Sequence, residues 1–306
     1  MYRVLIVGYG NIGKRYHQAI KKIDHNIEVF FKEKKTNIKE TERLNKLKKN
    51  LVDLVIVSTT ADVRLSEIKK INKNYKVKSW IIEKNLGQSV NQVNEIQKIF
   101  KNKNNIWMSS AYKTMRCYKN LKKELKNKSK LTVNVVGSDW GLVCNGTHFI
   151  DLFTWIFNEE VKKIDISNLE KKWIRSKRKN FYEAIGCLKI LYNTCQLNLI
   201  SKRINMKNDV FENITYEIKD KHNMSKYFHE EGIYIKNSKK KFLGNMEFLS
   251  DNMSKHIEEI LTKNKSSLFR LKDIIKAHRL FISKAFLHWK KFGQKKMKYK
   301  NVVPIT

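Results

Sequence analysis

The sequence has little of several features that mark modular or secreted proteins. It contains a single proline, Pro304, and no run of Gly, Ser and Pro that would indicate a flexible linker. Its four cysteines lie far apart and form no Cys-x-x-Cys pair, so neither a zinc site nor a disulfide framework is indicated. We therefore expect no bound metal, and we expect the reducing cytoplasm as the location.

Long hydrophobic runs are also missing. A membrane-spanning helix needs roughly 18 or more uninterrupted apolar residues, but the richest segment, 149–157, is short and contains Asp151. The chain starts directly with a strand-like run and a glycine loop, without the apolar segment and cleavage site of a signal peptide. We expect neither secretion nor insertion into a membrane.

Acidic residues are scarce, since 29 Asp and Glu face 64 Lys and Arg and leave a formal charge of +35. Such an excess often indicates a nucleic-acid partner, but here the charge is spread along the chain in pairs and triplets, as at 239–241, and no nucleic-acid-binding motif accompanies it. Nucleic acid is therefore not the expected partner. The hydrophobic share of 41% suffices for folded cores, and 306 residues favour two domains.

The clearest motif is a glycine loop near the N-terminus. Residues 2–7 read YRVLIV, which is typical of a buried parallel strand, and the next six read GYGNIG. Apolar residues then recur at helical spacing from Ile12 to Ile23. In this pattern the first glycine allows a tight turn, the second lets the backbone approach a pyrophosphate, and the third lets the helix pack closely. The candidate cofactor-binding residues here are Gly8, Gly10, Asn11, Ile12 and Gly13.

A second strand is expected at 27–31, and the residues after it bear on the choice of cofactor. A Rossmann fold places its ribose-reading residue at this point. Glu33 could accept a hydrogen bond from the 2′-hydroxyl of NAD, whereas Lys34 or Lys35 could pair with the 2′-phosphate of NADP. Both cofactors stay open, with NAD preferred.

Two further strands, at 53–58 and 80–82, are each followed by a polar turn and a helical stretch. Ser89 and Gln92 form a capping box for the helix after the second of them. Because strand and helix alternate, we predict a doubly wound parallel sheet, whose ligands bind at the carboxyl ends of its strands. The further cofactor candidates at these ends are Ser58, Thr59, Thr60, Glu83 and Lys84.

After Tyr112 the pattern changes to runs of strands, which predicts an α+β domain with a largely antiparallel, open sheet. The expected strands are 131–136, 161–167, 184–192, 195–200 and 214–218. Helices are expected at 118–126, 147–157, 246–263 and 268–289. We therefore predict two domains, 1–112 and 113–306. The exposed face of the second sheet needs a cover, so we predict a homo-oligomer, a dimer or tetramer, formed through that face.

Several segments together resemble the glucose-fructose oxidoreductase and inositol dehydrogenase family, also called Gfo/Idh/MocA. They cover nearly the whole chain. The segments are GYGNIG at 8–13, DLVIVSTT at 53–60, EKN at 83–85, Arg116 after IWMSSAY, NGTHFIDLFTW at 145–155 and the closing VPIT.

This resemblance implies an oxidoreductase that transfers a hydride between NAD or NADP and a hydroxyl or keto carbon of a sugar or nucleotide sugar, in surface-polysaccharide or amino-sugar biosynthesis. It implies that Lys84 lies beside the nicotinamide and that His148, on the facing domain, shares the handling of the substrate's hydroxyl proton. Lysine and histidine suit this role because their surroundings can tune both to exchange a proton near neutrality. The implied substrate-binding residues are Lys84, Tyr112, Arg116, Cys144, Asn145 and His148.

The chain departs from the family pattern at two positions. Cys144 stands where the family has an aspartate, and a thiol does not replace a carboxylate as a charge partner at neutral pH. Asp151, three residues after His148 on the same helical face, is the candidate catalytic residue that would orient the imidazole instead. Asn85 stands where the family's lysine motif has proline. These departures keep open an alternative, a cofactor-binding regulator or sensor of the same fold without turnover.

Overall fold

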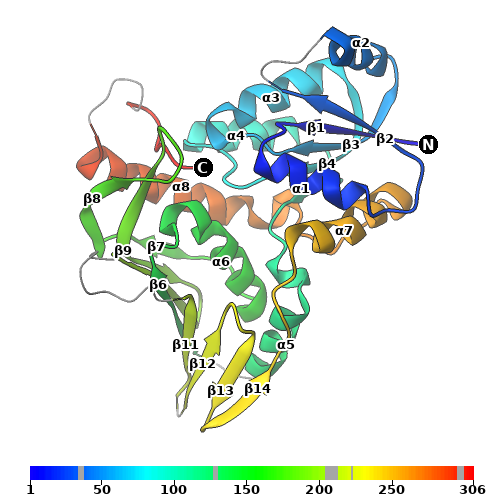
Figure 1. Cartoon of the computed structure of the whole chain (residues 1–306). Helices are drawn as coiled ribbons and strands as arrows, with labels where there is room; N and C mark the ends of the chain where they lie inside the picture. The colour runs from blue at the N-terminus through cyan, green and yellow to red at the C-terminus, as the bar shows by residue number, and fades with distance from the viewer. Residues whose placement is uncertain (34–37, 127–129, 204–212, 222, 295–299) are drawn as a thin grey trace. The chain divides into compact units, whose positions relative to one another are not determined.

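The computed structural model describes residues 1–33, 38–126, 130–203, 213–221, 223–294 and 300–306 (Figure 1). The chain forms two compact units. The first comprises Met1–Thr114, Glu247–Ile275 and Thr306, and the second comprises Met115–Met246 and Lys276–Ile305.

The first unit is built on a five-stranded parallel sheet in the order β2-β1-β3-β4-β5. The strand order reverses at β1, which lies between β2 and β3. The strands are β1 (Tyr2–Val7), β2 (Ile27–Lys32), β3 (Leu51–Val57), β4 (Lys76–Ile82) and β5 (Ile106–Met108). The predicted doubly wound parallel sheet is confirmed, because buried runs such as the last four residues of β1 are covered on both faces.

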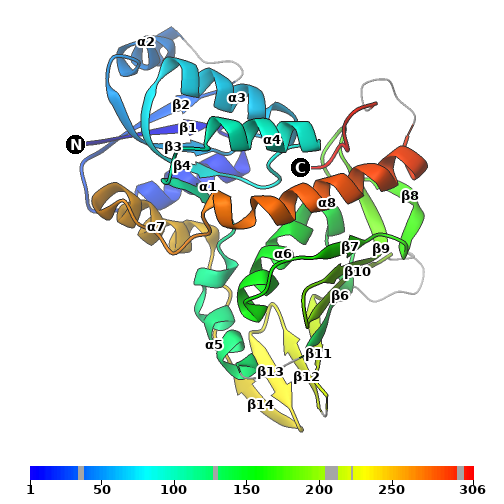
Figure 2. The same cartoon turned by 180° about the vertical axis from the view of Figure 1, so that it is seen from behind.

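Helices lie on both faces of this sheet (Figures 1 and 2). They are α1 (Asn11–Ile20), α2 (Ile38–Leu47), α3 (Ala61–Asn74), α4 (Val90–Ile99) and α7 (Leu249–Lys263). The predicted capping of α4 is present, since Ser89 Oγ accepts from the amide of Gln92 at 3.2 Å. The side-chain oxygen of Gln92 accepts a hydrogen bond from the amide of Gln88, one residue before the cap, at 2.6 Å.

Helix α7 marks where the observed division differs from the predicted one. The prediction assigned all of 113–306 to a second domain, but Glu247–Ile275 pack with the first unit. Met253, Ile257 and Ile260 of α7 join one buried cluster with Tyr16 of α1 and the sheet residues beneath them. The helical period of 246–263 predicted a helix with an apolar face, but nothing in that period identifies the surface that the face covers.

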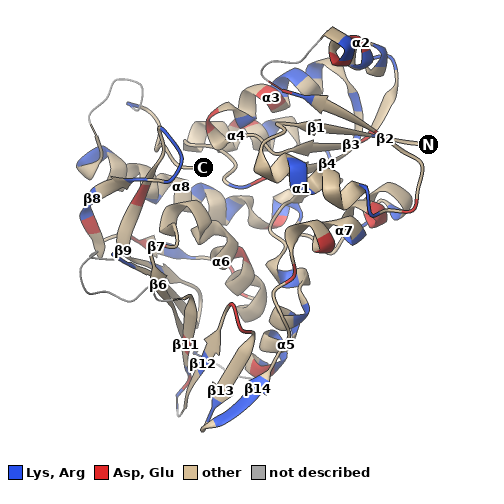
Figure 3. Cartoon of the chain, in the orientation of Figure 1, with Lys and Arg blue, Asp and Glu red and all other residues tan. Residues whose placement is uncertain are grey.

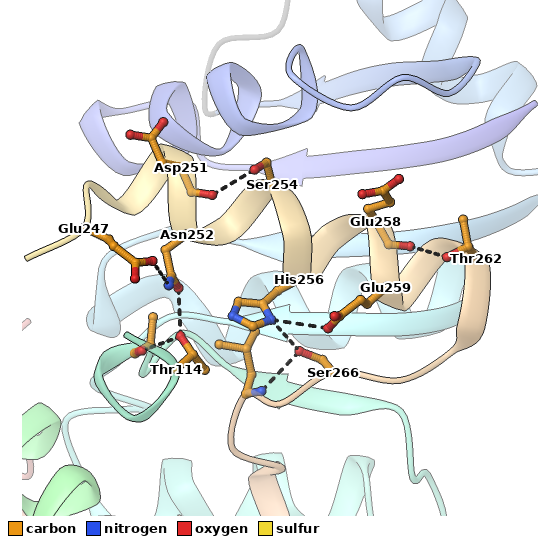
Figure 4. Close-up of polar contacts among 12 residues, drawn as sticks. Thr114, Glu247, Asp251, Asn252, Ser254, His256, Glu258, Glu259, Thr262 and Ser266 are labelled. Carbon is orange, nitrogen blue, oxygen red and sulfur yellow. Dashed lines mark hydrogen bonds and ion pairs between the residues drawn. The ribbon is translucent and has the colours of Figure 1, made fainter. Parts of the chain in front are cut away.

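Polar contacts fasten α7 and the loop after it to the first unit (Figure 4). Asn252 Oδ1 lies 2.9 Å from Thr114 Oγ1, and its Nδ2 donates to Glu247 at 2.7 Å. Beyond the helix, Ser266 Oγ lies 3.3 Å from His256 Nδ1 and accepts from the amide of Leu268. These contacts satisfy polar groups beside the buried stripe of α7.

The second unit is built on a nine-stranded sheet in the order β14-β13-β12-β11-β6-β10-β9-β7, with β8 also paired to β9. Only the β6–β10 pair is parallel among the pairs of this sheet in the described residues. The strands are β6 (Thr132–Ser138), β7 (Lys163–Asp165), β8 (Leu169–Arg175), β9 (Tyr182–Leu191), β10 (Gln196–Lys202), β11 (Thr215–Lys219), β12 (Met224–Phe228), β13 (Ile233–Lys236) and β14 (Lys239–Phe242). This confirms the predicted largely antiparallel sheet, although β8 and β12 to β14 were not predicted.

Helices α5 (Arg116–Leu125), α6 (Leu142–Phe157) and α8 (Leu271–Phe292) complete the chain, with a short 3-10 turn, η1, at Tyr112–Thr114. The close neighbour of Gly146 in α6 is Leu199 of β10, so α6 covers that face of the sheet. The opposite face, which we call the open face, presents half-exposed side chains. Gln196, Asn198, Asn134 and Glu217 hydrogen-bond there in a row across three strands.

Basic residues are spread over many elements of both units (Figure 3). They include the edge strand β14, which carries three exposed lysines, 239–241. Lysine on an edge strand hinders pairing with another chain. In the described part of the chain no helix is long and apolar enough to cross a membrane.

Candidate functional site

The glycine loop between β1 and α1 has the geometry that its spacing predicts. Gly8 has φ +90°, and a Cβ there would lie 3.0 Å from Thr59. A Cβ on Gly13 would lie 2.2 Å from the carbonyl oxygen of Gly8, so only glycine fits there. At Gly10, by contrast, a Cβ would meet nothing within 4 Å. Packing therefore requires Gly8 and Gly13, whereas Gly10 leaves an open side that suits a diphosphate lying against the backbone.

Neighbouring side chains hold this loop in shape. The Tyr9 hydroxyl lies 2.6 Å from His17 Nδ1, and the Tyr9 ring packs on Phe31 of β2 with centroids 4.5 Å apart. Burial and the charge of Lys21 lower the pKa of His17, which favours the neutral form of its ring. Ser58 Oγ, after β3, donates to the Gly8 carbonyl at 2.6 Å. Asn11 and Ile12 form the first two residues of α1.

Residues at the end of β2 bear on the choice of cofactor. Glu33 is exposed directly after the strand, while Lys34 and Lys35 lie outside the described residues. The last strand residue, Lys32, forms an ion pair with Glu67 of α3. Burial acts to raise the pKa of Glu67, but hydrogen bonds from Lys32 and Lys70 outweigh it and lower that pKa. The charge of Lys32 is therefore already balanced within the protein.

Residues 79–88, all of which the structure describes, are buried except for Lys84. Lys84 is the second residue after β4, at the same edge of the sheet as the glycine loop. The preceding Glu83 accepts a hydrogen bond from the Tyr16 hydroxyl at 2.8 Å. The peptide bond between Lys84 and Asn85, where the resembling family has proline, is cis. The structure thus brings together Glu83, Lys84, Ser58, Thr59 and the glycine loop within the first unit.

A buried arginine that sequence analysis did not single out connects two of these turns. The side chain of Arg64, in the first turn of α3, donates to the carbonyl oxygens of Thr59 and Asn85. Thr60 is the N-cap residue of α3, and the Thr306 hydroxyl accepts from the amide of Ala61 at 3.2 Å. Nothing in the sequence around position 64 marks this role, because an arginine on a helix normally reaches solvent.

In the second unit, the candidates from NGTHFID lie on α6. Residues 142–153 are all described, and the three that are not buried are Cys144, Asn145 and His148. His148 follows Cys144 by four positions and Asn145 by three, so both lie next to it on the helix surface. Asn145 Nδ2 donates to the carbonyl of Trp140 at 2.8 Å. The structure therefore collects three of the predicted substrate residues on one partly exposed face.

Asp151 lies on the buried side of α6 and has a strong partner of its own. Its two carboxylate oxygens lie 3.0 and 3.2 Å from Nε2 of His278 in α8, and both side chains are only 1% exposed. The pair ties α6 to α8. The role of Asp151 in orienting His148 stays a prediction. The Asp151 carboxylate is already hydrogen-bonded to His278.

Glu183 of β9 is a second residue that sequence analysis missed. Its Oε2 accepts from the amides of Val143 and Cys144, at 3.0 and 3.3 Å. A carboxylate thus lies at the N-terminus of α6, beside the position where the family pattern has its aspartate. A signal was present, because a glutamate inside an apolar strand needs a partner.

The remaining candidates are divided between the units. Tyr112 begins η1 in the first unit and is half-buried, whereas Arg116 begins α5 in the second and is exposed. In the described residues no group of three or more His, Cys, Asp or Glu side chains is placed to hold a metal ion.

No protein-family model matches the sequence, and no curated protein matches it. Solved structures do share its fold. A biliverdin reductase from Synechocystis, solved with biliverdin and NADP⁺, matches with a TM-score of 0.69 at 12% identity, covering 95% of this chain and 99% of that chain.

Two others resemble the chain to a similar degree. A UDP-N-acetylglucosamine 3-dehydrogenase from Acidithiobacillus ferrooxidans has a TM-score of 0.67 at 12% identity, covering 95% of this chain and 98% of that one. A transcriptional regulator from Kluyveromyces lactis has a TM-score of 0.65 at 16% identity, with coverages of 92% and 90%. At such low identities the likeness shows the fold alone: a Rossmann-type parallel sheet joined to a mixed, mostly antiparallel one.

Proposed function

We propose that the protein is an NAD(P)-dependent oxidoreductase that acts on a hydroxyl or keto carbon of a sugar or nucleotide sugar. One observation carries the proposal. The open side of Gly10 and the partly exposed Lys84 lie at the same edge of one parallel sheet, and Lys84 is the one residue of 79–88 that is not buried. The solved structures of the same fold include a UDP-sugar dehydrogenase and a reductase with NADP⁺, which supports the assignment.

The chain's own groups suit this chemistry. Free amides at the start of α1 bind a diphosphate, and their partial positive charge favours the anion. Glu33 accepts a hydrogen bond from the ribose in the NAD-binding form of the proposal, and Lys34 pairs with a phosphate in the NADP-binding form. When bound, the nicotinamide cofactor supplies or accepts the hydride. Lys84 and His148 hold and return the substrate's hydroxyl proton, and Asn145 orients the sugar.

We also infer a homo-oligomer, a dimer or tetramer, formed through the open face. Its centre carries the uncharged amides of Asn134 on β6 and Asn198 on β10, between Glu217 on β11 and Lys189 on β9. Lysine is depleted and uncharged groups are favoured at the cores of interfaces. Sedimentation of the wild type and of Asn198→Lys tests this, because a charge at the centre of the face is expected to shift the protein toward monomer. An unchanged mass would contradict the inference.

A second candidate function is a cofactor-binding regulator without turnover. The specific observation in its favour is Cys144, a thiol where the resembling family has a carboxylate. The regulator of the same fold is compatible with this reading. Both functions require the glycine loop to bind the cofactor, and they differ only in chemistry.

Absorbance of the reduced cofactor separates the two functions. The purified chain is mixed with NAD⁺ or NADP⁺ and a panel of UDP-sugars and free sugars, and with NADH or NADPH and the matching keto compounds. We expect a protein-dependent change at the nicotinamide band that Lys84→Met abolishes, with Lys69→Met as a control from the exposed surface of α3. Cofactor binding without any such change across the panel would favour the regulator.

A further inference from the structure

The turn that carries Lys84 is anchored on both sides by buried side chains from different helices. The residue before Lys84, Glu83, is bonded to Tyr16 of α1. The residue after it, Asn85, has its carbonyl bonded to Arg64 of α3. Glu83, Asn85, Tyr16 and Arg64 are each less than a tenth exposed. Lys84 is thus a partly exposed residue between two buried, hydrogen-bonded neighbours.

The anchor at Glu83 is a small polar network. The Tyr16 hydroxyl lies 2.8 Å from Glu83 Oε1 and 2.6 Å from Ser109 Oγ, and Ser109 follows β5. A carboxylate only accepts, so the single hydroxyl proton of Tyr16 goes to Glu83 and the Ser109 hydroxyl donates to Tyr16. Burial and the charge of Glu83 raise the pKa of Tyr16 well above its usual value, so the donor stays protonated. Charge-assisted bonds of this kind are strong and directional.

The anchor at Asn85 uses a cation. The guanidinium of Arg64 donates to the carbonyls of both Asn85 and Thr59, so one side chain fixes the turn after β4 to the turn after β3. A planar guanidinium presents several donors in a fixed fork, which a lysine ammonium cannot reproduce. Burying a charge is costly, and an apolar side chain would fill the same space more cheaply if packing were the only requirement.

We propose that Tyr16 and Arg64 are positioning residues that hold the Lys84 backbone from its two sides, so that the lysine side chain projects in a fixed direction from the sheet edge. The inference deepens the proposed function, because it concerns the residue on which that function depends. It predicts that loss of either anchor changes the behaviour of Lys84 while the rest of the first unit keeps its fold.

The test measures Lys84 itself rather than turnover. The full chain is labelled briefly with an amine-acylating reagent, and mass spectrometry gives the labelling rate of Lys84 relative to Lys69, which is exposed on α3. Tyr16→Phe and Arg64→Met are expected to raise this ratio by about fivefold, the factor that corresponds to losing one buried hydrogen bond. Arg64→Lys, which keeps one donor group, is expected to lie between Arg64→Met and the wild type.

Matched controls come from the same unit. Tyr75→Phe removes the hydroxyl of another tyrosine that is mostly buried, and Arg43→Met removes an arginine that pairs with Glu40 on α2. Neither is expected to alter the Lys84 ratio. Equal ratios in the wild type and in folded Tyr16→Phe and Arg64→Met would overturn the proposal. Should Arg64→Met fail to fold, Tyr16→Phe and Arg64→Lys still decide the question.

The labelling experiment tests the anchoring roles and cofactor binding independently of each other. Adding NAD(P) to the wild type during labelling is expected to protect Lys84, and a lack of protection would contradict cofactor binding beside it. The ratios measured without cofactor would then still confirm or refute the anchoring roles of Tyr16 and Arg64.

Discussion

Helices α1 and α6 both begin at a glycine, Gly10 and Gly141, and both carry residues of the candidate site. They differ in what lies at the backbone amides of their first turns. In the described structure no side chain caps α1 at Gly10, and the space beside it is open. At α6, Glu183 from a neighbouring strand already accepts from two amides. An anionic ligand is therefore expected at α1, while α6 serves as a rigid platform for side chains.

The difference extends to how each region is held. At the edge of the first sheet, side chains such as Arg64 and Ser58 bond to backbone carbonyls and so shape a backbone site. On α6, buried side chains pair with one another, as Asp151 does with His278. In the proposed function, the first region therefore contributes through the path of its backbone, and the second through the side chains that a packed helix presents.

The largest predicted effect is at the buried pair of the second region. Asp151→Ala leaves His278 buried without its carboxylate, which is expected to cost about 3 kcal/mol or more of unfolding free energy. Glu160→Ala, which removes an exposed partner of Lys276 on the same helix α8, should cost less than about 1 kcal/mol. Denaturant unfolding of the two variants measures both. Similar losses in both would show that the α6 platform does not depend on its buried pair.

The second unit should also weaken in mild acid. His229 is buried against the hydroxyls of Tyr118 and Tyr216, at 2.6 and 2.8 Å from Nδ1, and burial lowers its pKa from 6.5 to about 4. The folded state therefore keeps this ring neutral while the unfolded state gains a proton below pH 6.5. The contribution of neutral His229 to the free energy of unfolding is fully present above that pH. It is lost as the pH falls toward 4 and does not change further below that, and the total loss is about 3 kcal/mol.

His229→Gln is the variant that isolates this effect. It removes the titrating ring but keeps a polar group for the two tyrosines. Unfolding free energies between pH 7 and pH 4 should then depend less on pH than in the wild type. A slope identical to that of the wild type would assign the acid sensitivity to other groups.

Substitutions at Gly13 and at Gly10 should have different effects on stability and on cofactor affinity. Gly13→Ala places a Cβ against the Gly8 carbonyl, which is expected to cost about 1–3 kcal/mol of stability and to weaken cofactor binding. Gly10→Ala meets open space and has a φ of −75°, so stability should hold while cofactor affinity falls by about tenfold, equivalent to about 1.4 kcal/mol. Thermal unfolding and calorimetry together test this, and an unaffected affinity in Gly10→Ala would place the diphosphate elsewhere.

The smallest predicted effect is at the N-terminus of α6, where Glu183 accepts from two amides. Glu183→Gln removes the charge at the N-terminus of α6 but keeps an acceptor, so the expected loss is about 1 kcal/mol of stability. Cofactor affinity should not change, because this cap belongs to the second unit. Glu217→Gln on the open face is the matched control. A loss of cofactor affinity in Glu183→Gln alone would contradict the contrast drawn between the two helices.

Sequence patterns predicted what depends on neighbouring residues in the chain. Residues 2–7 form the predicted strand, and the spacing of Gly8, Gly10 and Gly13 indicated the turn that the structure contains. The placement of α7 against α1 could not be predicted, because the apolar face of a helix does not indicate which surface it packs against. Strands β12 to β14 were also missed, because β12 and β13 are only five and four residues long and β14 has three lysines in a row in place of an alternating pattern.

The candidate site shows the same limit. Motifs predicted Lys84 and His148 as site residues, which stays a prediction, whereas Tyr16, Arg64 and Glu183 make contacts with residues far away in the chain. The pairing of Asp151 with His278 spans 127 positions, which no local pattern reveals. Side chains that contact a ligand tend to sit in short motifs, whereas those that hold them in place are spread through the fold.

In the proposed function, the backbone amides of the glycine loop bind a nicotinamide dinucleotide. Calorimetric titration of the purified chain with NADH and with NADPH measures this binding. We expect saturable binding of at least one of them, with one site per chain and a weaker affinity in Gly10→Ala. Absence of binding heat with both dinucleotides, at temperatures chosen to avoid a vanishing enthalpy, would contradict it.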